Sequence, residues 1–202
     1  MRDFLVHAQL VRNASPFFDA ALKHEWREPT ERMVKLPEET SESFEIYLQW
    51  LYARRIFSRK EGDAAEKGAD DEFPRLSTCY LLGDRPQDAD FKDAILDALV
   101  EKVTSPTPRY PLSLHTTIYP KPTRTSPARR LLVDIAIWEW TGEELKWHVS
   151  GSPEDFYSDL SAKLATYRKG GQSGDAPYRT NTCLYHEHDN LKKPCYRTKY
   201  NI

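Results

Sequence analysis

Side chains of the kinds that commonly bind metal ions lie close together in sequence near the C-terminus of the chain. Four side chains that end in a thiol or an imidazole lie within thirteen residues, namely Cys183, His186, His188 and Cys195. Thiolates and imidazoles suit tetrahedral Zn²⁺, and a metal could hold together a segment that has no hydrophobic core of its own. The spacing differs from the paired-ligand arrangement of familiar zinc modules, so a polar tail without metal is the alternative interpretation.

Patterns of common catalytic sites are missing from the sequence. It contains no glycine-rich phosphate loop, no His-Glu-x-x-His helix and no Gly-x-Ser-x-Gly turn. Acidic clusters occur at 70–72 and 88–90, but they lie beside a predicted loop and a predicted helix start, where solvation and the helix dipole explain them. We therefore expect no enzymatic activity, and no cofactor other than the zinc considered above.

The charge balance and the apolar content of the sequence argue against nucleic acid and membranes as partners. Lysine and arginine (29) nearly balance aspartate and glutamate (31), so no long-range field attracts nucleic acid or an acidic membrane surface. The chain has no apolar run of the length that a membrane span requires and no signal-peptide pattern. Three cysteines without a disulfide pattern fit a reducing compartment, so we expect a cytoplasmic or nuclear protein.

The elements that must position these residues are mostly helices. Apolar residues at spacings of three and four predict helices over 16–21, 41–52, 76–83, 91–99, 127–141 and 153–169. Ser15 is the expected N-cap of the first of these helices, and Asp88 or Asp90 is the expected N-cap of the fourth. Short alternating stretches at 3–6 and 32–36 predict two strands.

Composition also predicts how the chain is divided. Residues 58–72 hold almost no large apolar side chain and are expected to form a mobile loop inside a first domain over 1–104. Prolines predict a linker over 105–125, since each lacks an amide donor and restrains its predecessor. A helical extension at 126–170 and a Cys/His-containing tail at 171–202 are expected after the linker.

Several strings in the first hundred residues resemble one family when they are taken in order. They are VHAQLV at 6–11, ASPFF at 14–18, VKL at 34–36, FEIYLQWLY at 44–52 and YLLGD at 80–84. Together they resemble the BTB/POZ domain, most closely its fungal branch, and LLVD at 131–134 with the Cys/His tail is similar to the region C-terminal to that domain in fungal proteins. The resemblance implies an α+β fold, mainly helical with a small sheet, and a helical C-terminal extension. The chain begins at what would be the second strand, so the first strand of the domain is expected to be missing.

The resemblance also implies a protein-interaction function. Members that recruit cullin scaffolds carry a hydrophobic residue, any residue and then an acid where this chain has Trp26, Arg27 and Glu28. Phe17, Phe18, Trp26 and Glu28 are therefore the predicted partner-binding residues of an adaptor for a cullin-based ubiquitin ligase. The alternatives are a scaffold or transcriptional cofactor that acts through self-association, with a homodimer weakened by the missing strand, and a zinc-binding module in the tail.

Overall fold

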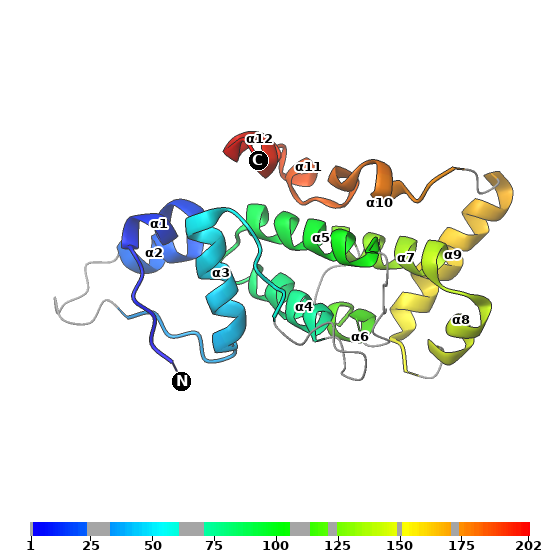
Figure 1. Cartoon of the computed structure of the whole chain (residues 1–202), viewed down its shortest axis with the longest axis horizontal. Coiled ribbons are helices and arrows are strands. Elements are labelled where there is room, and N and C mark those ends of the chain that lie inside the picture. The colour runs from blue at the N-terminus through cyan, green and yellow to red at the C-terminus, as the bar shows by residue number, and fades with distance from the viewer. Residues whose placement is uncertain are drawn as a thin grey trace.

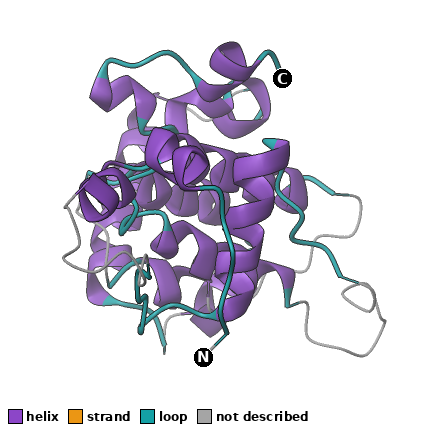
Figure 2. Ribbon diagram, turned by 90° about the vertical axis from the view of Figure 1, so that its left-hand side faces the viewer, coloured by secondary structure: helices purple, strands orange, loops and turns teal. Residues whose placement is uncertain are grey.

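The chain forms a helical structure. The computed structural model describes residues 2–23, 33–60, 71–105, 114–120, 125–148, 151–170 and 174–202, and within these ranges every regular element is a helix (Figure 2). The longer helices are α2 (Pro16–Lys23), α3 (Ser41–Ala53), α4 (Glu72–Leu82), α5 (Ala89–Val103), α7 (Pro127–Glu139) and α9 (Glu154–Gly170). The shorter ones are α1 (Ala8–Ala14), α6 (Leu114–Ile118), α8 (Gly142–His148), α10 (Pro177–Thr180), η1 (Thr182–Tyr185), α11 (His188–Leu191) and α12 (Tyr196–Tyr200).

The predicted small sheet is wrong for the part of the chain that the structure describes. Residues 3–6 show the expected alternation, because Phe4 and Val6 are partly buried while Leu5 is fully exposed. Residues 33–36 alternate in the same way. Neither stretch is paired with another strand in the described ranges. Alternation specifies which side of an extended chain is buried, but a strand also needs a neighbour to complete its hydrogen bonds, so the α+β prediction gives way to a helical fold.

The longer helices confirm the predicted helical patterns and two of the predicted caps. The Ser15 Oγ accepts a hydrogen bond from the amide of Phe18 (3.1 Å) and donates one to the Pro86 carbonyl (2.6 Å). The Asp88 Oδ1 accepts from the amide of Phe91 (3.0 Å), so Asp88 is the N-cap of α5. Both caps satisfy amides that the first helical turn leaves without a partner.

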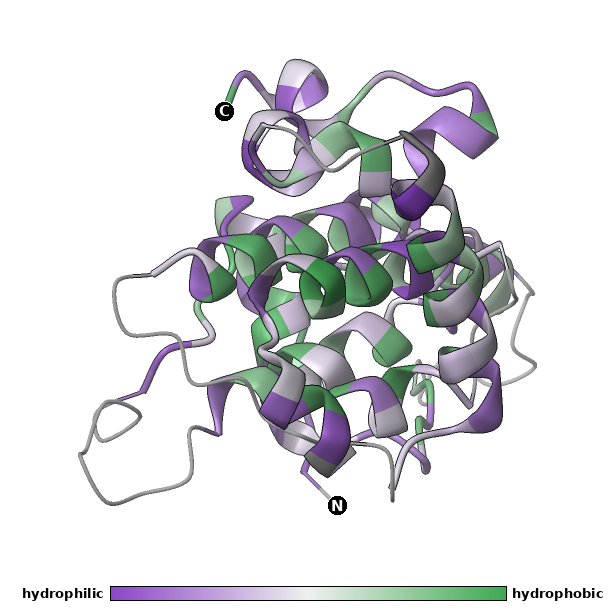
Figure 3. Ribbon diagram, turned by 90° about the vertical axis from the view of Figure 1, so that its right-hand side faces the viewer, coloured by the Kyte–Doolittle hydropathy of each residue, from purple (hydrophilic) through white to green (hydrophobic). Residues whose placement is uncertain are grey.

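Helix α5 lies at the centre of the molecule. In Figure 1 it runs between α4 below and the C-terminal segment above, and α7 continues beyond its end. The apolar sides of the helices face one another in the interior, as the hydropathy colouring of Figure 3 shows. Trp50, Tyr80 and Phe91 are fully buried there. Helix α5 therefore connects the N-terminal helices to the last part of the chain.

A single hydrophobic core crosses the predicted boundary at residue 105. It includes Trp50 and Phe91 before that point and Leu131 and Phe156 after it. Helix α6 lies inside the predicted linker, and its buried Leu114 and Ile118 belong to the same core, where α6 packs against α4. Residues 114–119, within the predicted linker, are thus part of the packed structure. None of the described helices has the length and apolar character required to cross a bilayer.

The C-terminal segment, which we define as residues 174–202, has little core of its own. Its helices have four or five residues each, and helices shorter than about 12 residues are marginal on their own in water. The segment buries few side chains, which are Ala176, Tyr178, Tyr185, His186 and Tyr196. It lies against α5 and α7 (Figure 1). Specific contacts with the helices beneath it must therefore hold it in place.

Candidate metal centre

The four metal-type ligands of the sequence converge in the structure. One ligand atom from each of Cys183, His186, His188 and Cys195 lies within 4.8 Å of the others. The two sulfur atoms are 3.8 Å apart, and the Cys195 Sγ is 3.8 Å from the His186 Nδ1. All three cysteines of the chain are free thiols. We call these four side chains the CHHC cluster.

The spacing in the CHHC cluster is close to that of a tetrahedral zinc site. With Zn–S near 2.3 Å and Zn–N near 2.05 Å, tetrahedral geometry puts two sulfurs about 3.8 Å apart, sulfur and nitrogen about 3.6 Å apart and two nitrogens about 3.4 Å apart. The observed sulfur–sulfur distance of 3.8 Å matches this edge. Adjustments on the order of 1 Å bring the remaining atoms to coordination distance.

Short turns of the C-terminal segment bring the ligands together. The Asn181 side chain accepts a hydrogen bond from the Cys183 amide (3.1 Å), which begins the single turn of η1, and the His186 amide donates to the Cys183 carbonyl (3.1 Å). Lys192 has a φ of 52°, in the left-handed region, and ends α11 so that the chain turns back before Cys195. Local backbone geometry thus accounts for the convergence of ligands that are twelve residues apart in sequence.

The imidazole of His186 is anchored from α5. Its Nε2 lies 3.0 Å from the Asp97 Oδ1, and the His186 side chain is fully buried. Burial by itself raises the pKa of Asp97, but hydrogen bonds from His186 and Tyr196 and the charge of His186 outweigh it and lower the pKa below its usual value. The ionised carboxylate can only accept, so the His186 Nε2 carries the hydrogen. The Nδ1 faces Cys195.

A second aspartate of α5 holds the backbone between the two histidines. The buried Asp93 accepts hydrogen bonds from the amides of Glu187 (2.5 Å) and His188 (3.4 Å). Burial raises the pKa of Asp93 to about 7, against the opposing effects of His186 and of these two amides. Its Oδ2 is 4.0 Å from the His186 Nδ1. Asp93 and Asp97 are one helical turn apart, so both reach the same part of the C-terminal segment.

The state of the other ligands is compatible with metal binding. The Nε2 of His188 is buried and has no hydrogen-bond partner among the described residues. Burial, and after it the charge of His186, lowers the pKa of His188, which favours the neutral imidazole that a metal requires. Burial and the neighbouring Cys195 raise the pKa of Cys183 to about 11, so this thiol keeps its proton at neutral pH until a metal displaces it.

The CHHC cluster is suited to structural rather than catalytic metal binding. Four protein ligands complete a tetrahedral shell, whereas catalytic zinc sites keep one position open for water or substrate. The sequence pattern predicts all four candidate ligands, and the structure brings these side chains together. The pattern did not identify Asp93 and Asp97, whose only sequence signal is a pair of carboxylates one turn apart on the helix that carries the buried Phe91 and Ile95.

Two of the predicted partner-binding residues, Phe17 and Phe18, lie in α2 rather than in the C-terminal segment. Phe18 is in the hydrophobic core, and Phe17 is partly buried against that core, in edge contact with Phe18. Trp26 and Glu28 fall outside the described residues. In this structure Phe18 is therefore a packing residue, and its side chain is not exposed to a partner.

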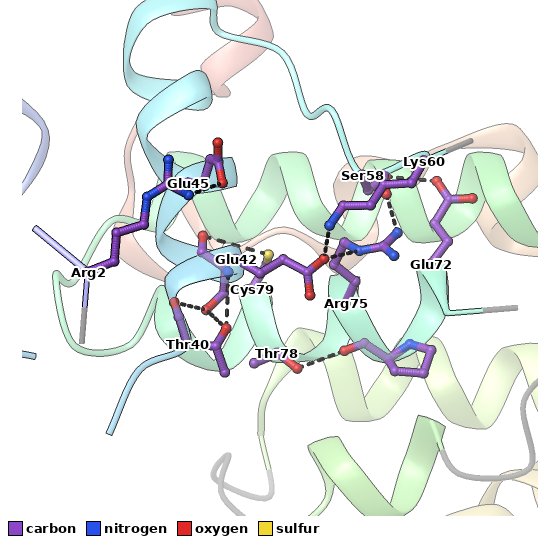
Figure 4. Close-up of polar contacts among 12 residues, drawn as sticks. Arg2, Thr40, Glu42, Glu45, Ser58, Lys60, Glu72, Arg75, Thr78 and Cys79 are labelled. Atoms are coloured by element: carbon purple, nitrogen blue, oxygen red, sulfur yellow. Dashed lines mark hydrogen bonds and ion pairs between the residues drawn. The ribbon is translucent and has the colours of Figure 1, made fainter. Parts of the chain in front are cut away.

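A polar cleft of about 290 Å³ lies between the start of α3 and α4. Figure 4 shows that Glu42 at this cleft contacts both Arg75 and Lys60, and that the Arg75 guanidinium also donates to the Ser58 carbonyl. Thr40 caps α3 at the rim of the cleft. The contact between Glu42 and Arg75 ties α3 to α4.

Comparisons with known proteins supply no relative for this chain. No protein-family model, no curated protein and no solved structure matched it. The resemblance to the BTB/POZ domain therefore stays a prediction from the sequence, and the function is argued from the site.

Proposed function

We propose that this protein is a non-catalytic protein-interaction module whose C-terminal segment is fixed by one structural zinc ion. The convergence of Cys183, His186, His188 and Cys195 within 4.8 Å carries the zinc-binding part of this proposal. Two thiols and two imidazoles form one of the usual ligand sets of structural zinc sites, and a free buried nitrogen on His188 is available to complete it.

A structural metal would add to the contacts with α5 and α7 that hold the C-terminal segment in place. Its helices have four or five residues each, and it buries few side chains. Binding energy that is realised only in the folded state contributes directly to folding stability. A zinc ion that joins η1, α11 and the start of α12 would offset the entropy of ordering this segment.

Metal analysis of the full chain tests the zinc site. Protein prepared without a histidine tag, equilibrated with Zn²⁺ and separated from free metal, is expected to retain one zinc per chain. Cys183→Ser with Cys195→Ser is expected to abolish retention, whereas Cys79→Ala, at the fully buried cysteine of α4, is expected to preserve it. Substitution with Co²⁺ should give the intense visible absorption of a tetrahedral thiolate site in the wild type and in Cys79→Ala. Equal metal content in the wild type and the double variant would refute the site.

The interaction function rests on the sequence resemblance, and cullin recruitment is its specific form. Purified chain is expected to bind the N-terminal region of a cullin in calorimetry, and Trp26→Ala with Glu28→Ala is expected to abolish that binding. Arg27→Ala, between the two, is the matched control because the pattern allows any residue there. Unchanged binding in the double variant would reject these residues as the contact, and no binding by the wild type would favour the self-associating alternative.

A further inference from the structure

We propose that Asp97 of α5 is the positioning residue of the CHHC cluster, because it selects Nδ1 of His186 as the metal-binding atom. Through Asp97, the metal site would also be joined to α5. This inference rests on the proposed zinc site. It differs from a self-contained zinc finger, in which residues near the ligands in sequence supply the whole environment of the metal.

The hydrogen bond to His186 carries the first half of the proposal. The two nitrogens of an imidazole point in different directions, and the one that donates a hydrogen bond cannot bind a metal at the same time. The Nε2 lies 3.0 Å from the Asp97 carboxylate, and the Nδ1 lies 3.8 Å from the Cys195 sulfur. A ring with no solvent exposure cannot turn freely to exchange these roles. Carboxylates in this position orient ligating histidines and raise their basicity.

The second oxygen of Asp97 carries the other half. Its Oδ2 accepts a hydrogen bond from the Tyr196 hydroxyl (2.5 Å) and pairs with the Arg197 guanidinium (2.8 Å). These residues come directly after the ligand Cys195. The Asp97 carboxylate therefore contacts the ligand His186 through one oxygen and the residues that follow the ligand Cys195 through the other.

Asp93 completes this outer environment from the same helix. It holds the amides of Glu187 and His188, which link the two histidine ligands. The Asp93 and Asp97 carboxylates of α5 thus contact the His186 ring, the His188 amide and the chain after Cys195, which lie about ninety residues away in sequence. The metal would join the C-terminal segment to the central helix of the fold.

Asp90 provides a matched control on the same helix. It pairs with Lys199 (2.6 Å) and accepts from the Tyr200 hydroxyl (3.0 Å), so it ties α12 to α5 much as Asp97 does. Both of these partners lie outside the four ligands of the cluster. A residue that only fastens α12 should therefore behave like Asp90, whereas a residue that orients a ligand should not.

The test compares Asp97→Ala, Asp97→Asn and Asp90→Ala in the full chain. Zinc affinity, measured by competition with a fluorescent chelator, is expected to fall about 10–100-fold in Asp97→Ala, as for other residues that support metal ligands. Asp97→Asn keeps an acceptor for the Nε2 hydrogen and should lose less. Asp90→Ala should bind zinc as the wild type does. Circular dichroism on each metal-free variant identifies any that fails to fold. If Asp97→Ala does not fold, the zinc affinity of Asp97→Asn is compared with that of the wild type instead.

Nitrogen NMR of the histidine rings shows which nitrogen of His186 carries the hydrogen. A residue that only stabilised the fold would not change this readout. The wild type and Asp90→Ala should show His186 with its hydrogen on Nε2, both without metal and with zinc on Nδ1. Metal-free Asp97→Ala should lose this single tautomer. Zinc on the Nε2 of His186, or wild-type affinity in a folded Asp97→Ala, would overturn the inference while leaving the zinc site intact. Absence of zinc from the wild type would instead remove the proposed function.

Discussion

Replacing Asp88 with asparagine is expected to stabilise the protein above pH 6. Asp88 is the N-cap of α5 and is only 4% exposed. Its Oδ1 accepts from the Phe91 amide (3.0 Å), and its Oδ2 accepts from the Tyr47 hydroxyl (3.3 Å). Asparagine is as good an N-cap as aspartate, and its side-chain oxygen can keep the bond to Phe91. The substitution therefore removes a buried charge and retains the cap.

The size of the effect can be worked out from the pKa of Asp88. Burial, and after it the charge of Asp90, raises this pKa from 3.8 to about 6 against the lowering effects of the Phe91 amide, Arg54 and Tyr47. A carboxyl with a raised folded-state pKa favours folding most below its unfolded pKa, and this contribution is lost as the pH rises through about 6. At pH 7.5 the charged form costs about 3 kcal/mol, at about 1.4 kcal/mol per pH unit between the two pKa values. Since the amide must also be desolvated, we expect a gain of about 1–3 kcal/mol.

Urea denaturation of the wild type and Asp88→Asn at pH 4 and pH 7.5 measures this gain. The stability of the variant relative to the wild type should be higher at pH 7.5 than at pH 4 by about 2–3 kcal/mol. Both proteins carry the same CHHC cluster, so its own pH dependence cancels in the difference. Asp175→Asn, at an exposed position, is the control and should show the same difference at both pH values. An Asp88→Asn variant that is no more stable than the wild type at pH 7.5 would refute the argument.

Three further perturbations test the core, a cap and the metal centre. Leu131→Ala, at a fully buried position beyond residue 105, should lower the free energy of unfolding by about 2–5 kcal/mol. Urea unfolding of this variant should still show a single transition, because the core is continuous. Two separate transitions would contradict a shared core. Ser15→Ala removes the cap of α2 and leaves the Pro86 carbonyl unpaired. Thermal unfolding should therefore show that the free energy of unfolding falls by about 1–3 kcal/mol. A neutral result would mean that water replaces the hydroxyl. Zinc binding must displace the proton of Cys183, whose pKa is raised to about 11, so calorimetry in buffers of different ionisation enthalpy should detect at least about one proton released per zinc near pH 7. No release would exclude Cys183 as a thiolate ligand.

Local sequence patterns are enough to predict the longer helices and the four candidate metal ligands. Spacings of three and four place apolar side chains on one face of a helix wherever that helix packs, so α3, α5 and α7 were predictable from the local pattern. Ser15 and Asp88 were predictable as caps because a cap depends on residues only three positions away. The CHHC cluster was visible for the same reason, since its ligands lie within thirteen residues.

The way in which these elements pack together could not be predicted from local patterns. Residues 3–6 carry a strand pattern, but periodicity cannot show whether a neighbouring strand exists, and the described part of the chain provides none. The packing of α6 on α4 inside a proline-rich stretch depends on contacts between distant residues. The same holds for Asp97 and His186, which are 89 residues apart and meet only because the C-terminal segment folds back onto α5. Local rules predict the four candidate ligands, whereas the two carboxylates of α5 reach them only through the tertiary fold.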